Sequence, residues 1–322
     1  MDEKLITAKE ELQAKLQEIA LNKTGNAVME LGKIANTPYD AELPIDPLIE
    51  KLCNVDRIGK GEDYQYFSIG VDTKTVVTIS NGSVTQTAVT PDTVNDLSFN
   101  SYNGEAEYVY VEKLLEAKYD VIAKSEKKIM EALNRKEIKD VLDVLIASAV
   151  SEDNTFALDS GVSYITLAKL DEMIMSIEKY GTKIVAVAGS TCASDIRKLN
   201  YNEDKNQEIN LKAFGIDEVI KVPTFQYTHS TTMTVLDADK LVLVALSDSE
   251  GGKPVDFVRR KVADVFAGGD DKERIIVPSG PRLQVGSNPK WAYEIAVMEQ
   301  YGVVQPNPKA VAVFKRDTSY SW

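Results

Sequence analysis

A long β-hairpin, over residues 64–102, is the strongest structural signal in this sequence. Aromatic and polar residues alternate at its start, and a β-branched run follows at 75–79. Asn81-Gly82 then forms the dipeptide that best indicates a tight hairpin turn, because both positions accept positive φ. The returning residues 83–89 are rich in Thr and Val and carry no charge. A lone two-stranded hairpin is marginally stable in water, so we expect this one to lie against another protein surface.

The residues before the hairpin predict an extended arm. Residues 2–21 place an apolar stripe on one face of a helix, a shorter helix is expected over 26–35, and three prolines follow before residue 55. The stripe must dock somewhere, and a neighbouring subunit is as plausible as the chain's own core. We select these candidate inter-subunit contact residues on the arm and the hairpin: Leu5, Leu12, Leu16, Ile19, Val76, Val77, Ile79, Asn81, Gly82 and Val84.

After the hairpin, helical and strand patterns are mixed. Helical periodicity predicts the helices, and alternating or continuous apolar runs predict the strands. We expect helices over 108–134, 136–149, 166–180 and from about 190 to 199, and strands over 183–188, 218–223, 232–235, 240–245, 291–301 and 310–314. Because strands and helices do not alternate regularly, the predicted fold class is α+β.

Charge and composition exclude several classes of protein. The chain of 322 residues has 50 Asp and Glu against 37 Lys and Arg, a net charge of −13, which argues against a protein built to grip nucleic acid. The dense basic triplet Arg259-Arg260-Lys261 is interpreted as a surface cluster on a helix. Two distant cysteines indicate a reducing compartment. The sequence contains neither a membrane-length apolar run nor a signal-peptide core, so we expect an unexported protein.

No motif supports catalysis. The single histidine, His229, would have to carry any Ser-His-Asp triad or Cys-His pair, and no Cys cluster supplies zinc ligands. The turn Gly189-Ser190-Thr191 follows a buried strand and precedes a helix, as a phosphate-binding turn would. It lacks the further glycines or Gly-Lys-Ser/Thr of the known nucleotide motifs, which favours an ordinary strand–helix corner. We therefore expect no enzyme, no cofactor and no metal site.

The order of these elements resembles that of the major capsid proteins of tailed bacteriophages with the Hong Kong 97-type fold. The resemblance covers nearly the whole chain and rests on order and spacing. Residues 108–115 are similar to the start of the family's spine helix, and 215–223 to its strand entering the axial domain. Residues 301–310 are similar to its usual C-terminal ending.

The resemblance implies a division of the chain. Residues 1–55 would be the N-terminal arm and 56–105 the extended E-loop hairpin. Residues 106–160 would form the peripheral domain with its spine helix, and 161–265 mainly the axial domain. Residues 266–322 would return to the peripheral domain and end in the C-terminal strand.

The resemblance also implies a function. The chain would be a structural capsid protein that assembles into hexamers and pentamers, forming an icosahedral head around double-stranded DNA in the virion. Its partners would be copies of itself, scaffold, portal or decoration proteins, and non-specifically held DNA, with no membrane. Assembly would occur in the cytoplasm of the bacterial host. Two alternatives stay open: an encapsulin-like nanocompartment shell, and an α/β nucleotide-binding enzyme using Gly189-Ser190-Thr191.

Overall fold

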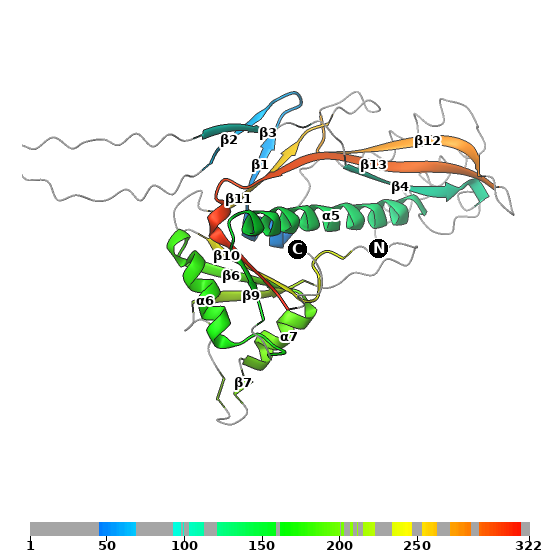
Figure 1. The fold of residues 1–322 in the computed structure, drawn as a ribbon. Helices are drawn as coiled ribbons and strands as arrows, with labels where there is room; N and C mark the ends of the chain where they lie inside the picture. The colour runs from blue at the N-terminus through cyan, green and yellow to red at the C-terminus, as the bar shows by residue number, and fades with distance from the viewer. Residues whose placement is uncertain are drawn as a thin grey trace, which may run out of the picture.

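Two β-sheets joined by one long helix organise the protein (Figure 1). The computed structural model describes residues 45–68, 93–97, 99, 103–112, 121–158, 162–199, 201–202, 207–208, 211, 215–222, 234–246, 253–262, 271–284 and 290–316. The helices predicted over 2–21 and 26–35 and the hairpin tip at 75–89 lie outside these residues.

The first sheet, here called the long sheet, is built around strand β13 (Lys290–Val304). Its order is β1-β11-β13-β12, and β4 (Asn103–Tyr110) pairs with β13 on the side opposite β12 (Arg274–Gln284). The last residues of β13 pair with β11 (Val255–Arg260), which lies parallel to β1 (Cys53–Ile58). The strand predicted over 291–301 is confirmed.

Helix α5 (Val121–Ser151) runs along the long sheet and reaches the second sheet (Figure 1). It corrects two predictions. The helices expected over 108–134 and 136–149 are continuous across residue 135, and the first does not begin at residue 108, because its first described helical residues are 111 and 112. Tyr108 and Val109 lie in strand β4 instead, paired with Glu294 and Tyr293 of β13. Their alternating aromatic and β-branched residues fit a strand as well as a helix, and the neighbouring strand decides between them.

The second sheet, here called the compact sheet, has the order β5-β14-β10-β6-β9. Its strands confirm those predicted over 183–188, 218–223, 240–245 and 310–314, and the helices predicted over 166–180 and about 190–199 are also present. The strands are β5 (Thr155–Ala157), β14 (Val311–Lys315), β10 (Lys240–Leu246), β6 (Lys183–Ala188) and β9 (Ile216–Lys221); the helices are α6 (Leu167–Ile177), η1 (Glu178–Tyr180) and α7 (Ser190–Leu199). The strand expected over 232–235 is wrong in its described part, because Thr234 and Val235 lie in an irregular bend.

The compact sheet is buried on both faces, which explains its continuous apolar runs. On β10, Val242 and Val244 join a core shared with α5, the short helix α3 (Pro47–Leu52) and β11. The alternate residues Leu241 and Leu243 join a second core beneath α6 and α7. The first core extends to the long sheet, so the two sheets and α5 form one packed body.

Smaller elements complete the described chain. The base of the predicted hairpin is present as the antiparallel pair β2 (Tyr64–Ser68) and β3 (Thr93–Leu97), here called the hairpin stem. Strands β7 (Tyr201–Asn202) and β8 (Gln207–Glu208) pair with each other, and η3 (Pro308–Ala310) precedes β14.

Candidate functional site

The corner at 189–191 is a packing feature of the compact sheet. The backbone amides of Thr191 and Cys192 both donate to the carbonyl oxygen of Ala238, at 3.0 and 3.2 Å. A Cβ atom added to Gly189 would lie 2.1 Å from a backbone carbonyl oxygen, so the absence of a side chain permits this close approach. Because these amides are occupied inside the fold, the corner does not present them to a phosphate. The geometry therefore disfavours the nucleotide-binding alternative.

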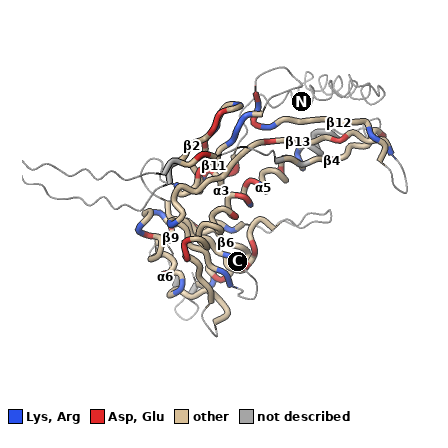
Figure 2. Tube along the Cα trace, turned by 45° about the horizontal axis from the view of Figure 1, so that its top comes forward, with Lys and Arg blue, Asp and Glu red and all other residues tan. Residues whose placement is uncertain are grey.

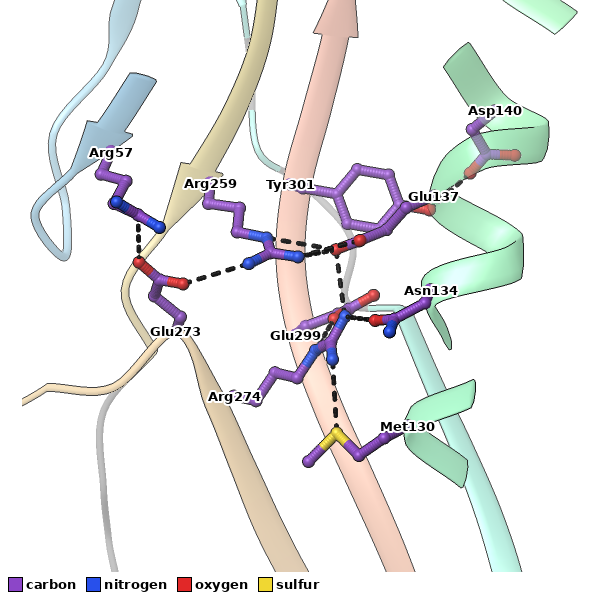
Figure 3. A network of polar contacts seen from close by, with 10 residues as sticks. All are labelled: Arg57, Met130, Asn134, Glu137, Asp140, Arg259, Glu273, Arg274, Glu299 and Tyr301. Carbon is purple, nitrogen blue, oxygen red and sulfur yellow. Dashed lines mark hydrogen bonds and ion pairs between the residues drawn. The ribbon is translucent and has the colours of Figure 1, made fainter. Parts of the chain in front are cut away.

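A buried cluster of charged side chains, here called the ionic cluster, joins α5 to the long sheet (Figure 3). Its members come from the helix and from several strands, so residues far apart in sequence meet at one point. They are Met130, Asn134, Glu137 and Asp140 of α5, Arg57 of β1, Arg259 of β11, Glu273 before β12, Arg274 of β12, and Glu299 and Tyr301 of β13.

Glu137 lies at the centre of the ionic cluster and is completely buried. Arg259 donates to both of its carboxylate oxygens, at 2.7 and 2.8 Å from Nη2, in a bidentate geometry. Arg259 Nη1 also donates to Glu273, at 3.2 Å, and Glu273 contacts Arg57 at 2.7 Å. Burial alone would lower the pKa of Arg259, but Glu137 and the neighbouring carboxylates reverse the shift and raise it. This guanidinium group therefore stays charged inside the protein.

Arg274 divides its donors among four groups. Its Nη2 donates to Asn134 at 2.9 Å and to Glu137 at 3.1 Å, and its Nη1 lies 3.3 Å from the sulfur of Met130. Its Nε donates to Oε2 of Glu299. The other carboxylate oxygen of Glu299, Oε1, is buried and receives no hydrogen bond from the residues that the structure describes.

Tyr301 extends the ionic cluster toward the middle of α5. Its hydroxyl donates to Asp140 Oδ2 at 2.7 Å, and its ring packs 5.3 Å from that of Phe257. Burial raises the pKa of Tyr301, and the carboxylate of Asp140 raises it further, so the phenol stays protonated and continues to donate. Successive turns of α5 are thereby connected to the long sheet, at Glu137 through Arg259 and Arg274 and at Asp140 through Tyr301.

The ionic cluster fixes the position of α5 more than it adds to stability. Burying charges costs several kcal/mol per ion, which their mutual attraction only offsets when all partners are in place. The arrangement therefore penalises any other register of the helix on the sheet. It also corrects the interpretation of the basic triplet, since Arg259 lies buried in a strand. No local pattern could reveal this, because Glu137 is 122 positions from Arg259 and 137 from Arg274.

The hairpin stem is attached to the long sheet on both of its strands. The hydroxyl of Tyr64 in β2 lies 2.7 Å from Asp56 and 3.2 Å from Asp256. Burial raises the pKa of Tyr64, and the hydrogen bond to Asp56 raises it further. On the returning side, Leu97 packs so closely on Gly302 of β13 that a Cβ there would lie 2.6 Å from its side chain. The stem is thus held at its base.

The face of the long sheet turned away from α5, here called the outer face, is mostly apolar. On β4, β13 and β12, every second residue faces away from α5. Most of these residues are small or apolar, and the polar ones are Glu294 and Ser279. Ala106 and Tyr108 are exposed to solvent. Long uncharged stretches of β12 and β13 are visible in Figure 2. The outer face comprises Gly104, Ala106, Tyr108, Ile275, Val277, Ser279, Glu294, Ala296 and Met298.

Solved structures of similar architecture decide the fold. A chain from Microbacterium phage Oxtober96 matches with a TM-score of 0.55 at 14% identity, covering 86% of this chain and 94% of that one. One from Mycobacterium phage Adephagia matches with a TM-score of 0.51 at 9% identity, covering 89% and 94%. The chain has the Hong Kong 97-type capsid fold. At these identities the likeness establishes the fold and leaves the function to be argued.

Two further findings complete the comparison. The holo-SrpI encapsulin complex from Synechococcus elongatus matches with a TM-score of 0.49 at 16% identity, covering 90% of this chain and 97% of that one, a likeness too weak to carry an argument. No protein-family model matches the chain, and no curated protein is similar to it in sequence.

The predicted inter-subunit contact residues fall outside the described residues. This applies to Leu5, Leu12, Leu16, Ile19, Val76, Val77, Ile79, Asn81, Gly82 and Val84, and also to His229. Within the described ranges, no group of three or more His, Cys, Asp or Glu side chains could hold a metal ion. None of the described helices is long and apolar enough to cross a membrane.

Proposed function

We propose that this chain is the major capsid protein of a tailed bacteriophage, assembling into hexamers and pentamers that close into an icosahedral head around double-stranded DNA. The observation that carries the proposal is the fold, whose likeness to the Oxtober96 chain extends over 86% of this chain and 94% of that one. The capsid-type fold is a structural scaffold. The backbone amides of Gly189, Thr191 and Cys192 donate within the fold, which disfavours a phosphate-binding turn at this corner.

The two sheets suggest how the proposed domains are arranged. We assign the long sheet and α5 to the peripheral domain, and the compact sheet with α6 and α7 to the axial domain. The arm is proposed for residues 1–55 and the E-loop for 56–105. The peripheral domain is proposed to begin with residues 106–160, and residues 161–265 are proposed to form mainly the axial domain. Residues 266–322 are proposed to return to the peripheral domain and to end in the C-terminal strand. Strands β5 and β14 of the compact sheet lie within 106–160 and 266–322, and strand β11 of the long sheet lies within 161–265, so the chain passes between the two proposed domains inside each of these ranges.

The outer face and the hairpin stem support a model of subunit contacts. Ala106 and Tyr108 are exposed on this apolar sheet face. Covering the face with another surface would remove it from water, which is favourable. The stem is held at its base by Tyr64 and Leu97, and the weakly charged hairpin residues continue from it. The hairpin of one subunit would lie across the outer face of its neighbour, and the N-terminal arm would dock beneath another.

The acidity of the chain suits a container for DNA. A net charge of −13 provides no general attraction for phosphates, so packaged DNA would be held loosely and could move. Scaffold, portal and decoration proteins are the further partners that this function would require.

The first experiment is sedimentation velocity with negative-stain electron microscopy of the purified full chain. Closed shells, tubes, or rings of five or six subunits are the expected result. A chain that remains monomeric under all assembly conditions, including with phage partner proteins present, would overturn the proposal.

A matched pair of variants tests the outer face. Ala106→Glu places a charge on the exposed outer face, and Ala147→Glu places one on an exposed position of α5. We expect Ala106→Glu to prevent shell formation and Ala147→Glu to allow it, with both subunits equally resistant to denaturant. Normal shells from Ala106→Glu would contradict the proposed contact surface.

A further inference from the structure

Glu299 is the carboxylate of the ionic cluster with the fewest partners. Glu137 accepts from Arg259 on both oxygens and also from Arg274. Glu299 accepts from Nε of Arg274 on Oε2, while its buried Oε1 receives no hydrogen bond from the described residues. A buried oxygen without a donor is the place where a negative charge costs most and where a proton is most favourable.

The surroundings of Glu299 contain both signs of charge. From β12 it faces Arg274, from β11 Arg259, and from α5 the carboxylate of Glu137. The neighbour on β4 in the strand register is Asn103, which does not titrate. Asn134 and Met130 of α5, Tyr301 with Asp140, and Arg57 with Glu273 form the remainder of the cluster.

Among the deeply buried members of the ionic cluster, acidic groups outnumber basic ones. Three carboxylates (Glu137, Glu273 and Glu299) and two guanidinium groups (Arg259 and Arg274) are each at least nine-tenths buried. Arg57, the third guanidinium group, is about a third exposed and lies at the edge beside Glu273. Water screens its charge, so the deeply buried part of the cluster is left with an excess of negative charge when all three carboxylates are ionised.

We propose that the ionic cluster holds one exchangeable proton on Oε1 of Glu299, and that release of this proton to solvent loosens the attachment of α5 to the long sheet. The protonated acid keeps its Oε2 contact with Arg274 and removes the surplus charge. Release of the proton leaves an ionised carboxylate whose buried Oε1 receives no hydrogen bond from the described residues. The subunit would therefore be most firmly packed below neutral pH, a property that does not depend on whether it assembles.

The direction of the pH dependence follows from linkage. Burial raises the pKa of Glu299 from 4.5 to about 7, with Arg274 opposing the shift and Glu137 adding to it. Because the folded state binds this proton more tightly than the unfolded chain, its stabilisation is complete below about pH 4.5 and is lost as the pH rises through about 7.

Denaturant unfolding at a series of pH values tests the proposal on the full chain. For the wild type we expect the unfolding constant to rise by about two orders of magnitude between pH 5 and pH 8, because one proton held only by the folded state changes that constant about tenfold per pH unit. Glu299→Gln mimics the protonated acid and should flatten this dependence. Glu294→Gln, the same change on the outer face of β13, should keep it. A wild-type slope in Glu299→Gln would overturn the proposal.

Infrared difference spectroscopy between pH 6 and pH 8 detects the proton directly. We expect the carbonyl band of a protonated carboxylic acid at pH 6, lost at pH 8 and absent from Glu299→Gln. Should that variant not fold, Glu299→Asp retains a carboxyl group and should shift the band. Absence of a titrating band from the wild type, or a band that neither variant changes, would refute the proposal. None of these measurements requires shells, so they fail or succeed independently of the proposed function.

Discussion

Arg259 shows how one side chain can hold several distant segments in place. Its guanidinium group contacts Glu137 of α5 and Glu273 before β12, while its backbone pairs with β13. Arginine suits this role because its planar fork donates in several directions at once and remains charged when buried. A lysine could satisfy one of these carboxylates but not both in the same geometry.

Replacing this residue should be strongly destabilising. Arg259→Met would leave Glu137 and Glu273 buried without their main donor, and we expect a loss of about 3–5 kcal/mol in the free energy of unfolding. Denaturant unfolding monitored by circular dichroism measures the change. Arg282→Met removes a guanidinium group that is 67% exposed and should cost less than about 0.5 kcal/mol. Equal effects of the two changes would contradict the role assigned to the ionic cluster.

The two cysteines should resist thiol reagents in the folded chain. Cys53 and Cys192 are free and buried, and burial raises the pKa of Cys192 to about 12 and also raises the pKa of Cys53. Because the thiolate is the reactive form, labelling at pH 8 should be at least about 100-fold slower in the native protein than in denaturant. Rapid labelling of either cysteine in the native chain would contradict this packing.

Helix α5 connects the two sheets. With 31 residues it is roughly 46 Å long, and its two halves have different partners. Ile129 and Leu133 are buried in the half that lies along the long sheet. Leu142 and Leu145 join the core of the compact sheet. The helix is therefore packed against both sheets.

Shortening a buried side chain in the second half of α5 should lower the free energy of unfolding of the packed body formed by the two sheets and α5. Leu145 is completely buried between the helix and the compact sheet, so we expect Leu145→Ala to cost about 2–5 kcal/mol. Thermal and denaturant unfolding should give a single transition for this variant. Val150→Ala, near the end of the same helix and 38% exposed, is the control and should cost less than about 1 kcal/mol. A large loss from the control alone would contradict this packing of the helix.

At the scale of the whole molecule, apolar surface is distributed unevenly. The compact sheet is covered on both faces, whereas the long sheet is covered by α5 on one face and presents the partly exposed outer face on the other. This asymmetry is expected of a subunit whose burial is completed by its neighbours, and it agrees with the proposed shell.

The content of assembled particles should distinguish phage heads from nanocompartments. If the chain is a phage capsid protein, particles isolated from an infected host should contain double-stranded DNA, shown by the absorbance ratio at 260 and 280 nm and by nuclease digestion after disruption. Empty particles assembled from the purified chain are the control. Particles that instead enclose a stoichiometric enzyme would support the encapsulin-like alternative.

Several elements could be predicted from local sequence alone. The strands over 183–188, 240–245 and 291–301 were predictable because continuous or alternating apolar residues reflect burial directly. The start of the helix was not, because the residues from Tyr108 to Tyr110 fit both periodicities and their pairing with β13 decides the outcome. The ionic cluster was also beyond local reasoning, since its charged members are individually ordinary and their meeting depends on the packed sheets.

The sequence by itself determined the α+β class, most of the strands of the compact sheet and the absence of a recognisable catalytic motif, and it predicts outside contacts along the arm and hairpin. These follow from composition and from periodicity within short windows. Only the tertiary structure decided that one helix joins two sheets, that Arg259 is buried, and that Glu299 has an oxygen without a donor among the described residues. Those features depend on contacts between residues more than 100 positions apart or on neighbouring strands, which local patterns do not encode.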